Sequence, residues 1–361
     1  MRKHYSVIII GAGPAGSNLA RRIDSKRYDV LLIDGSKQRG EKVCGGLLSP
    51  DAQDLLAEYD ISIPSDVLAS PQLFSVRTID LGTDDMQYYR RSYMNIDRAK
   101  FDAFLLNMVP DTVEKVKGIC KFINKLGEGY VLQVKTDTGT ETITCDYVVG
   151  ADGANSVVRR YLFPEKKVQR YVAIQQWFEA QDENPFYSCV FDNETSPSCS
   201  WIFFKDGKLV FGGAFESKGC RQMFEEQKRK LVEKGIISEK VVVEPIRTEA
   251  CQVVRPHFLK GICRGKDSAF LVGEAAGFIS PSSLEGISFA LASGEHLSEA
   301  FRQNIGGESI LQYYKKRTDT LCFKVKCKCM KRPFMYHPVL RTLVLKSGVS
   351  AMKIKIQENR V

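Results

Sequence analysis

The chain has 361 residues, of which 43% are hydrophobic and 26% charged, and a formal net charge of +9 at pH 7. This composition is ordinary for a soluble globular protein, and the length suits a large core shared by two joined domains. No apolar run approaches the ~20 residues of a membrane-spanning helix. The short run after Arg2-Lys3-His4 is interrupted at Gly11, which argues against a signal peptide. We therefore expect a cytoplasmic protein.

The cysteines do not suggest covalent or metal cross-links. The chain has 11 cysteines, an odd number, and they are scattered, which favours a reducing compartment over a disulfide framework. Cys322, Cys327 and Cys329 come closest to a ligand cluster, yet they lack a clear fourth partner. We predict no metal site.

The positive charge is concentrated at the end of the chain. Residues 315–361 hold 13 Lys and Arg residues against two acids, Asp319 and Glu358. Three interpretations stay open: a solvated helical face, a contact with the anionic inner surface of a membrane, and a contact with an acidic electron-carrier protein. Nucleic acid is not expected as a partner, because nothing else in the chain resembles a nucleic-acid module.

A glycine-rich turn near the start carries the strongest signal. The apolar run 7–10 predicts a buried parallel strand, and the residues after 16 have helical apolar spacing. In such a turn the first glycine allows the bend, the second lets backbone approach a pyrophosphate, and the third lets helix pack on strand. The residues that we expect to hold a dinucleotide here are Gly11, Gly13, Pro14, Ala15 and Gly16.

A second predicted strand, 30–33, ends in Asp34, where an acid can hydrogen-bond a ribose hydroxyl. Glycines alone could serve only the packing of strand on helix, but strand, turn, helix, second strand and terminal acid together indicate a dinucleotide site. The acid favours FAD or NAD over NADP.

Two further positions follow this unit. The paired glycines of Cys44-Gly45-Gly46 indicate a close backbone approach, either to a flavin or substrate or within a tight turn that buries the thiol. Residues 95–106 predict a helix with Asp97 near its start. Arg98 is then either a surface charge or a phosphate and flavin contact.

The remaining pattern in the first half is largely of strands. Strands are expected at 73–79 and 86–89, around 113–116, 130–135 and 141–145, and at 147–149. The last one runs into Asp152 and Gly153, which either hold a cofactor or simply cap a helix.

A third candidate cofactor segment follows a predicted strand at 269–272. Glu274 stands at the strand end, where it can accept from a ribityl hydroxyl, and Gly277 lies in a run of small residues. Gly286 and Ile287 begin a helix that extends to about residue 301, and its N–H groups would lie near a flavin ring.

Residues 171–251 alternate apolar and polar positions and predict a second sheet. We expect its aromatic residues to form an apolar substrate pocket, although plain core packing is the competing interpretation. The pocket residues proposed are Trp177, Tyr187, Trp201 and Phe203. No charged residue is obviously placed among them to hold a polar head group, although Arg91 or Lys205 could.

Together, Gly11–Gly16, Gly150–Arg159 and Gly273–Ile287 resemble the three FAD motifs of the flavoprotein superfamily that holds p-hydroxybenzoate hydroxylase and the geranylgeranyl reductases. Cys44–Gly46, Arg98–Asp102 and Ser200–Lys205 are most similar to the reductases. Tyr171–Phe178 and Gly273–Ile279 resemble more closely a bacterial branch, of unnamed reaction, that is related to those reductases. Two departures occur: Glu274 replaces the usual Asp, and Phe204 replaces a Pro that the reductases carry.

The resemblance implies an α/β fold with a Rossmann-like FAD-binding domain, an inserted mainly antiparallel sheet as substrate domain, and a helical C-terminal tail. The implied boundaries are FAD-binding segments 1–70, 96–170 and 263–303, substrate segments 71–95 and 171–262, and a basic tail at 304–361. Reduced FAD would pass a hydride to a carbon–carbon double bond of an isoprenoid or other apolar substrate. Cys44 is the candidate catalytic residue near the ring.

The source of electrons stays open, because the chain has a single complete dinucleotide fingerprint. NAD(P)H or a reduced electron carrier would therefore bind only transiently. Two alternative functions remain: an FAD-dependent monooxygenase that hydroxylates an aromatic or apolar small molecule, and a non-enzymatic flavin- or lipid-binding protein at the membrane surface.

Overall fold

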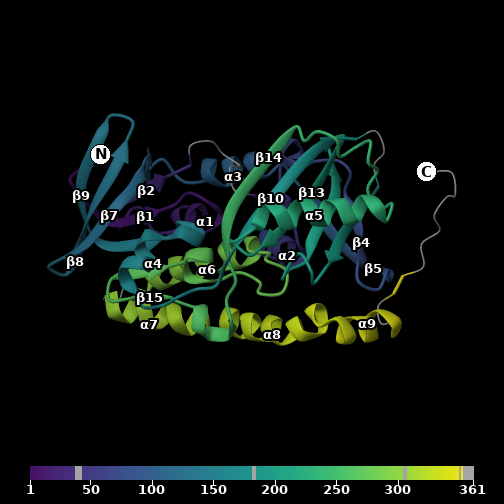
Figure 1. The fold of residues 1–361 in the computed structure, drawn as a ribbon. Helices are drawn as coiled ribbons and strands as arrows, with labels where there is room; N and C mark the ends of the chain where they lie inside the picture. Colours follow the sequence, from purple (N-terminus) through teal and green to yellow (C-terminus); the bar gives the residue numbers. More distant parts are fainter. Residues whose placement is uncertain (37–42, 181–183, 304–306, 349–350, 353–361) are drawn as a thin grey trace.

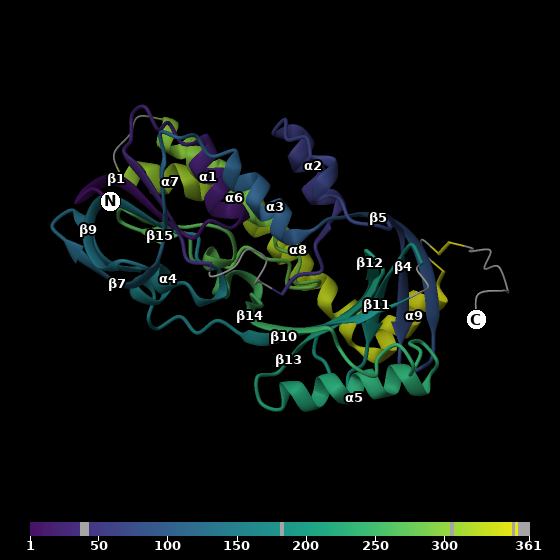
Figure 2. The same ribbon diagram turned by 90° about the horizontal axis from the view of Figure 1, so that it is seen from above.

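The computed structural model describes residues 1–36, 43–180, 184–303, 307–348 and 351–352. It contains two large sheets, one at each end of the molecule, with helices packed on both (Figures 1 and 2). This arrangement confirms the predicted fold class. Parts of the expected loop after Asp34 and of the expected tail, at 37–42, 304–306, 349–350 and 353–361, lie outside the described residues.

The first sheet has the order β15-β16-β9-β1-β2-β6, and the β7–β8 hairpin extends it beyond β9. Strands β16, β9, β1, β2 and β6 run parallel to one another. Its strands are β1 (His4–Ile10), β2 (Val30–Asp34), β6 (Glu114–Lys117), β7 (Ile119–Leu126), β8 (Gly129–Thr136), β9 (Gly139–Gly150), β15 (Gly265–Lys266) and β16 (Ala269–Leu271).

Strand β1 is central because its side chains are apolar on both faces. Val7, Ile8 and Ile9 are completely buried, as a parallel strand covered by helices on each side requires. The neighbours β2 and β9 pair with β1 in register, so their carboxyl ends reach the same edge of the sheet. That edge carries the loops of the site.

The second sheet has the order β14-β10-β13-β12-β11-β4-β5-β3 and is antiparallel except for the β11–β4 pair. Its strands are β3 (Leu47–Leu48), β4 (Leu73–Asp80), β5 (Met86–Asn95), β10 (Arg170–Glu179), β11 (Phe186–Phe191), β12 (Ser200–Lys205), β13 (Lys208–Phe215) and β14 (Arg247–Val254). The chain therefore leaves the first sheet and returns to it more than once.

Helices complete both layers. They are α1 (Pro14–Arg22), α2 (Pro50–Glu58), α3 (Arg98–Asn107), α4 (Val157–Leu162), α5 (Cys220–Glu233), α6 (Ile287–Arg302), α7 (Gly307–Arg317), α8 (Asp319–Tyr336) and α9 (Pro338–Lys346), with short 3-10 turns η1 (Ser65–Val67), η2 (Gly153–Asn155), η3 (Phe258–Gly261) and η4 (Gly273–Ala276). Helix α6 packs on α1, and α5 covers the outer face of the second sheet (Figure 2), where Phe224 stacks on Phe211 with ring centroids 4.8 Å apart.

The C-terminal helices α7, α8 and α9 run along one edge of the molecule and span both sheets (Figure 1). The Tyr314 hydroxyl donates to the Leu271 carbonyl at 2.8 Å, which anchors α7 on the first sheet. The Arg341 Nε donates to Asp80 Oδ2 at 2.6 Å, which anchors α9 on the second sheet. Both side chains of this pair are almost completely buried.

Several elements differ from the sequence-based expectation. Strand β7 and the helices α2 and α5 were not predicted, and the strands expected at 141–145 and 147–149 form the single strand β9. Within the described ranges, no helix is both long and apolar enough to cross a membrane. In the same ranges no group of three or more metal-ligating side chains gathers, and Cys329 instead accepts from the Phe258 N–H at 3.1 Å.

Candidate active site

A cavity of about 700 Å³ lies where the two sheets meet. Its walls include loops at the carboxyl ends of β1, β2 and β9, the start of α6, and side chains of the second sheet. The predicted residues that line it are Gly11, Gly13, Pro14, Ala15, Asp34, Cys44, Gly45, Arg98, Asp152, Gly153, Tyr187, Trp201, Phe203, Glu274, Gly286 and Ile287.

The glycine turn has two kinds of position. A Cβ at Gly16 would lie 1.8 Å from the Gly11 carbonyl oxygen, so this glycine permits the contact of helix and strand. At Gly11, φ is +109° and a Cβ would lie 2.5 Å from the Ala151 oxygen. A Cβ at Gly13 would meet no protein atom within 4 Å. Because Gly13 lines the cavity, its missing side chain leaves room for a ligand rather than for the protein.

The N-terminus of α1 is prepared for an anion. Pro14 occupies its first turn, which contains no acidic residue, and Gly13 provides no side-chain cap. The uncapped N–H groups and the positive end of the helix dipole therefore face the cavity. Asp34, at the end of β2, forms an ion pair with Lys117 at 2.6 Å. Burial opposes its ionisation, but the hydrogen bonds from Lys117 and Ser36 hold the pKa of Asp34 below its ordinary value.

Asp152 provides a direct test of whether a cofactor fits. Its Oδ2 accepts from the Val157 N–H at 2.7 Å, whereas its Oδ1 is buried without a hydrogen-bond partner among the described residues. Burial also raises the pKa of the Asp152 carboxyl. A buried oxygen left unpaired in a cavity wall is costly unless a ligand supplies a donor. The hydroxyl and amide groups of FAD provide such donors.

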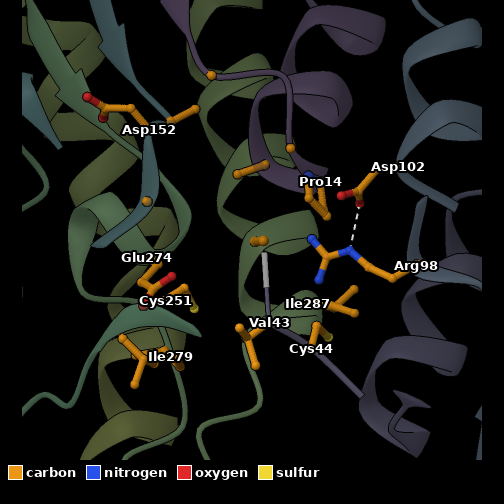
Figure 3. Close-up of a pocket in the computed structure, with 18 of the residues that line it drawn as sticks. Pro14, Val43, Cys44, Arg98, Asp102, Asp152, Cys251, Glu274, Ile279 and Ile287 are labelled. Atoms are coloured by element: carbon orange, nitrogen blue, oxygen red, sulfur yellow. Dashed lines mark hydrogen bonds and ion pairs between the residues drawn. The ribbon is translucent and has the colours of Figure 1, made fainter. Parts of the chain in front are cut away.

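The third segment is joined to the second motif and to β14. Glu274 Oε1 accepts from the Val254 N–H at 3.0 Å, and Arg159 Nη1 donates to the carbonyls of Glu274 and Ala275, each at 3.1 Å. Gly277 does not line the cavity, because it packs behind it against the Gly261 carbonyl. Figure 3 shows Asp152 and Glu274 on one side of the pocket, with Arg98 and Cys44 on the other.

Cys44 lies in a positively charged environment. Burial opposes ionisation of the thiol, but Arg98, the Gly46 N–H and Lys205 together hold the pKa of Cys44 below its ordinary value. Arg98 is oriented by Asp102, whose Oδ1 accepts from Arg98 Nε at 2.8 Å (Figure 3). The site can therefore stabilise a thiolate or another negative charge beside the start of α6.

Lys205 does not hold a ligand head group. Its Nζ donates to the Gly45, Gly46 and Ile96 carbonyls at 2.6, 3.3 and 2.6 Å and ties the Cys44 loop to β12. Burial lowers the pKa of Lys205 to about 8. Gly46 lies behind the cavity wall, where a Cβ would lie 2.4 Å from both Lys205 Nζ and the Ile96 oxygen.

Aromatic rings form the part of the cavity contributed by the second sheet. Tyr187 lies 5.0 Å from Tyr93 and 6.3 Å from Phe203, measured between ring centroids. Trp201 donates from Nε1 to Gln175 Oε1 at 2.9 Å, which fixes its indole in the same wall. This end of the cavity suits an apolar ligand.

Trp177 is placed differently from the prediction. It lines a second, smaller cavity of about 280 Å³, and its Nε1 donates to Glu249 Oε2 at 2.8 Å. The residue lies on β10 opposite Val210 of β13 and Arg247 of β14, beyond the reach of the main cavity. Cys44 and Arg98 line both cavities and so form part of the partition between them.

A polar cluster in the cavity wall was not predicted from the sequence. The Tyr93 hydroxyl donates to Glu285 Oε1 at 2.7 Å and accepts from Arg91 Nε at 2.9 Å. Ser283 donates to the other oxygen of the same carboxylate, Glu285 Oε2, at 3.0 Å. Burial and the neighbouring Glu285 raise the pKa of Tyr93 far above its ordinary value. Arg91 was considered a head-group ligand, but here it binds Tyr93. The contact between Tyr93 of β5 and Glu285 could not be predicted from the sequence, because the two residues are 192 positions apart.

Comparisons with known proteins agree with this geometry. An FAD binding domain family matches residues 126–321, and a pyridine nucleotide-disulphide oxidoreductase family matches residues 5–174. Protein CbrA of Escherichia coli O6:H1 is 41% identical over 353 residues, covering 96% of this chain and 94% of its own. Protein CbrA of Shigella sonnei is 40% identical and covers 96% and 98%.

Solved structures share the fold at low identity. A geranylgeranyl bacteriochlorophyll reductase-like protein from Thermoplasma acidophilum has a TM-score of 0.80 at 18% identity, covering 95% of this chain and 91% of its own. A probable FAD-dependent monooxygenase from Pseudomonas aeruginosa has a TM-score of 0.70 at 16% identity, covering 95% and 100%. A flavin-dependent brominase has a TM-score of 0.68 at 18% identity, covering 95% and 94%.

The fold, the glycine cradle and the family match define an FAD-dependent oxidoreductase of the flavoprotein superfamily, with FAD as its cofactor. The structural neighbours include both reductase-like and oxygenating proteins, so the class alone leaves the reaction open. At the level of close sequence relatives, the chain belongs to the CbrA family.

Proposed function

We propose that this protein reduces a carbon–carbon double bond of an isoprenoid or another apolar substrate. The observation that carries the proposal is the aromatic wall of Tyr187, Trp201 and Phe203, which faces the same cavity as the FAD motifs. An apolar wall beside a cofactor site binds an apolar substrate and keeps water out. When bound, FAD supplies hydride transfer.

Reduction of a double bond adds a hydride to one carbon and a proton to the other, so the site needs a proton donor. Tyr93 is our candidate, because its phenol lines the cavity beside Tyr187 and carries a proton at neutral pH. Burial and the neighbouring Glu285 raise the pKa of Tyr93 and so oppose release of this proton, which makes a compensating positive charge necessary. Arg91, which donates to the Tyr93 oxygen, would offset the charge of the phenolate left after proton transfer. Solvent would then return the proton to Tyr93.

The reaction can be tested without oxygen. We would reduce the FAD-loaded protein with dithionite, remove the excess, and add isoprenoid lipids anaerobically while following flavin absorbance. Reoxidation coupled to a gain of about two hydrogens per double bond is the expected result. Product that forms only after oxygen is admitted would instead indicate a monooxygenase. This is the second candidate function, and the observation that favours it is the fold shared with a probable FAD-dependent monooxygenase.

The proton donor has a separate test. Tyr93→Phe should lower the rate of double-bond reduction by about 100-fold or more, since a positioned general acid contributes roughly that much. FAD content and the rate of flavin reduction by dithionite should stay unchanged. Tyr89→Phe is the matched control, because Tyr89 lies on the same strand and does not line the cavity. Equal losses in both variants, or none in either, would remove Tyr93 from this role.

A further inference from the structure

The exposed surface of α8 and α9 combines large apolar side chains with lysines. We call this surface the outer face. Its apolar members are Phe323, Met330, Phe334, Val339 and Leu343, which are 66%, 60%, 56%, 62% and 61% exposed. Single exposed apolar residues are ordinary, but three at helical spacing on α8, followed on α9 by a pair four residues apart, favour a partner.

The helical period places the apolar residues of α8 in one stripe. Met330 and Phe334 follow Phe323 by seven and eleven residues, close to two and three full turns. Lys324 and Lys331 flank this stripe on one side and Lys326 on the other, and all three are exposed. Figure 1 shows α8 and α9 forming one edge of the molecule.

The outer face also lacks negative charge. Residues 320–348 contain no Asp or Glu. The neighbouring Asp319 is neutralised by Arg264 at 2.6 Å, and Asp51 lies against Lys328 at 3.8 Å. Lys324, Lys326 and Lys331 form no ion pair with any other residue of the described ranges, so their charges are available to an external anion.

We infer that the outer face docks on the surface of an anionic lipid bilayer. A helix that carries aromatic and aliphatic side chains on one stripe and lysines beside it lies in the bilayer interface, with the apolar stripe inserted and the lysines at the phosphates. The inference concerns where the protein works. It does not depend on the reaction proposed above.

Other occupants fit this surface less well. A second copy of the chain related by a two-fold axis would bring two such faces together, and residues 320–348 of either copy offer the lysines no carboxylate, which makes the contact repulsive. An acidic protein would pair with the lysines, but it gives no reason for Phe323, Met330 and Phe334 to be exposed together. An anionic bilayer satisfies both the charges and the apolar stripe.

The docking helices are held firmly by their inner side. Leu321, Val325 and Cys329 are buried in the core of the first sheet, and the Arg341–Asp80 ion pair secures α9 on the second sheet. The outer face therefore needs no unfolding to reach the bilayer, and it offers its stripe in a fixed orientation.

The test uses the full-length FAD-loaded protein and sedimentation with vesicles. We expect binding to vesicles of phosphatidylcholine mixed with phosphatidylglycerol, little binding to phosphatidylcholine alone, and release at high salt. Reversing the three lysines to Glu should lower the vesicle partition coefficient by about 100-fold. Equal binding to both kinds of vesicle, or none to either, would overturn the inference without any variant.

Apolar variants complete the test. The triple variant Phe323→Ser, Phe334→Ser, Leu343→Ser should reduce binding by at least about tenfold, with unchanged flavin absorbance and circular dichroism. The matched control changes three apolar residues exposed elsewhere, Phe74, Leu126 and Val243, to Ser. Equal loss in the control would overturn the inference. So would a wild-type dimer that ignores vesicles and dissociates in the triple variant, which would assign the outer face to a second copy.

Discussion

The glycines of the first turn have different functions although they belong to one motif. Gly16 is enclosed by protein atoms, whereas the space beside Gly13 is open to the cavity. A side chain at Gly16 would therefore damage the fold, and a side chain at Gly13 would obstruct the cofactor. The distinction can be measured because the two effects appear in different experiments.

We predict that Gly13→Val raises the dissociation constant for FAD by at least about tenfold and leaves the melting temperature of the apoprotein unchanged. Gly16→Val should destabilise the apoprotein by about 3 kcal/mol or more, since its Cβ would overlap the Gly11 oxygen. Flavin titration and urea unfolding of the apoproteins check both statements. Destabilisation by Gly13→Val would show that the space beside it is not open.

Cys44 gives a prediction for pH dependence. A folded-state pKa below the ordinary thiol value means that the thiolate persists to lower pH, so the midpoint of the rate of alkylation against pH should lie below that of a free thiol. Arg98→Met should shift this midpoint upward. Mass spectrometry of the peptide that contains Cys44 separates it from the ten other cysteines. A midpoint that Arg98→Met does not move would rule out Arg98 as the cause.

The limits of sequence reasoning are visible at this scale. The glycine, Asp34 and Asp152 positions are local to strand ends, so their place in the cavity could be predicted from neighbouring residues. Tyr93 and Glu285 are 192 residues apart and meet only because β5 and the segment before α6 lie at the same cavity. No local pattern indicates that pairing.

At the scale of elements, the chain's regular apolar runs were predicted well and its polar elements poorly. Strand β7 has mostly exposed positions, so it lacks the alternation that marks a half-buried strand. Helix α5 buries only Phe224, Gln227 and Leu231 among many charged residues, which hides its apolar face. Both elements are fixed by the sheets on which they pack.

The buried ion pair between α9 and β4 yields a prediction about these elements. Arg341→Met leaves Asp80 buried without its cation, which should lower the free energy of unfolding by about 3–5 kcal/mol. Faster hydrogen exchange in α9 should accompany the loss, because this contact anchors the helix. Urea unfolding and hydrogen-exchange mass spectrometry measure the two effects.

Arg229→Met provides the control for that measurement. Arg229 forms ion pairs with Glu226 and Glu233 on the exposed surface of α5, so its loss should change the free energy of unfolding far less than Arg341→Met does. The double variant Asp80→Leu, Arg341→Leu should be more stable than Arg341→Met, since it leaves no buried charge. A wild-type exchange pattern in Arg341→Met would contradict the anchoring role.

At the scale of the whole molecule, the two sheets share the cavity, and neither forms it alone. Gly13 and Asp152 come from loops of the first sheet, while Tyr187 and Phe203 come from strands of the second. The two-sheet architecture could be predicted because each sheet has its own pattern of apolar residues. The placement of Trp177 in a separate cavity could not be predicted, because it depends on how the two sheets pack against each other.

The order of strands in the first sheet has a consequence for how the protein is made. Strand β16 pairs with β9 at Val148, Val149 and Gly150, yet its partner residues, Ala269–Leu271, stand 121 positions later in the chain. At about 5–20 residues per second, roughly 6 to 24 seconds pass before this strand has been synthesised. The cavity for the cofactor is thus completed late in synthesis. A ribosome-bound chain that stops before β16 would contain the glycine turn but would lack the wall formed by the Glu274 segment. We therefore expect stable FAD binding only after residues 269–271 have been synthesised.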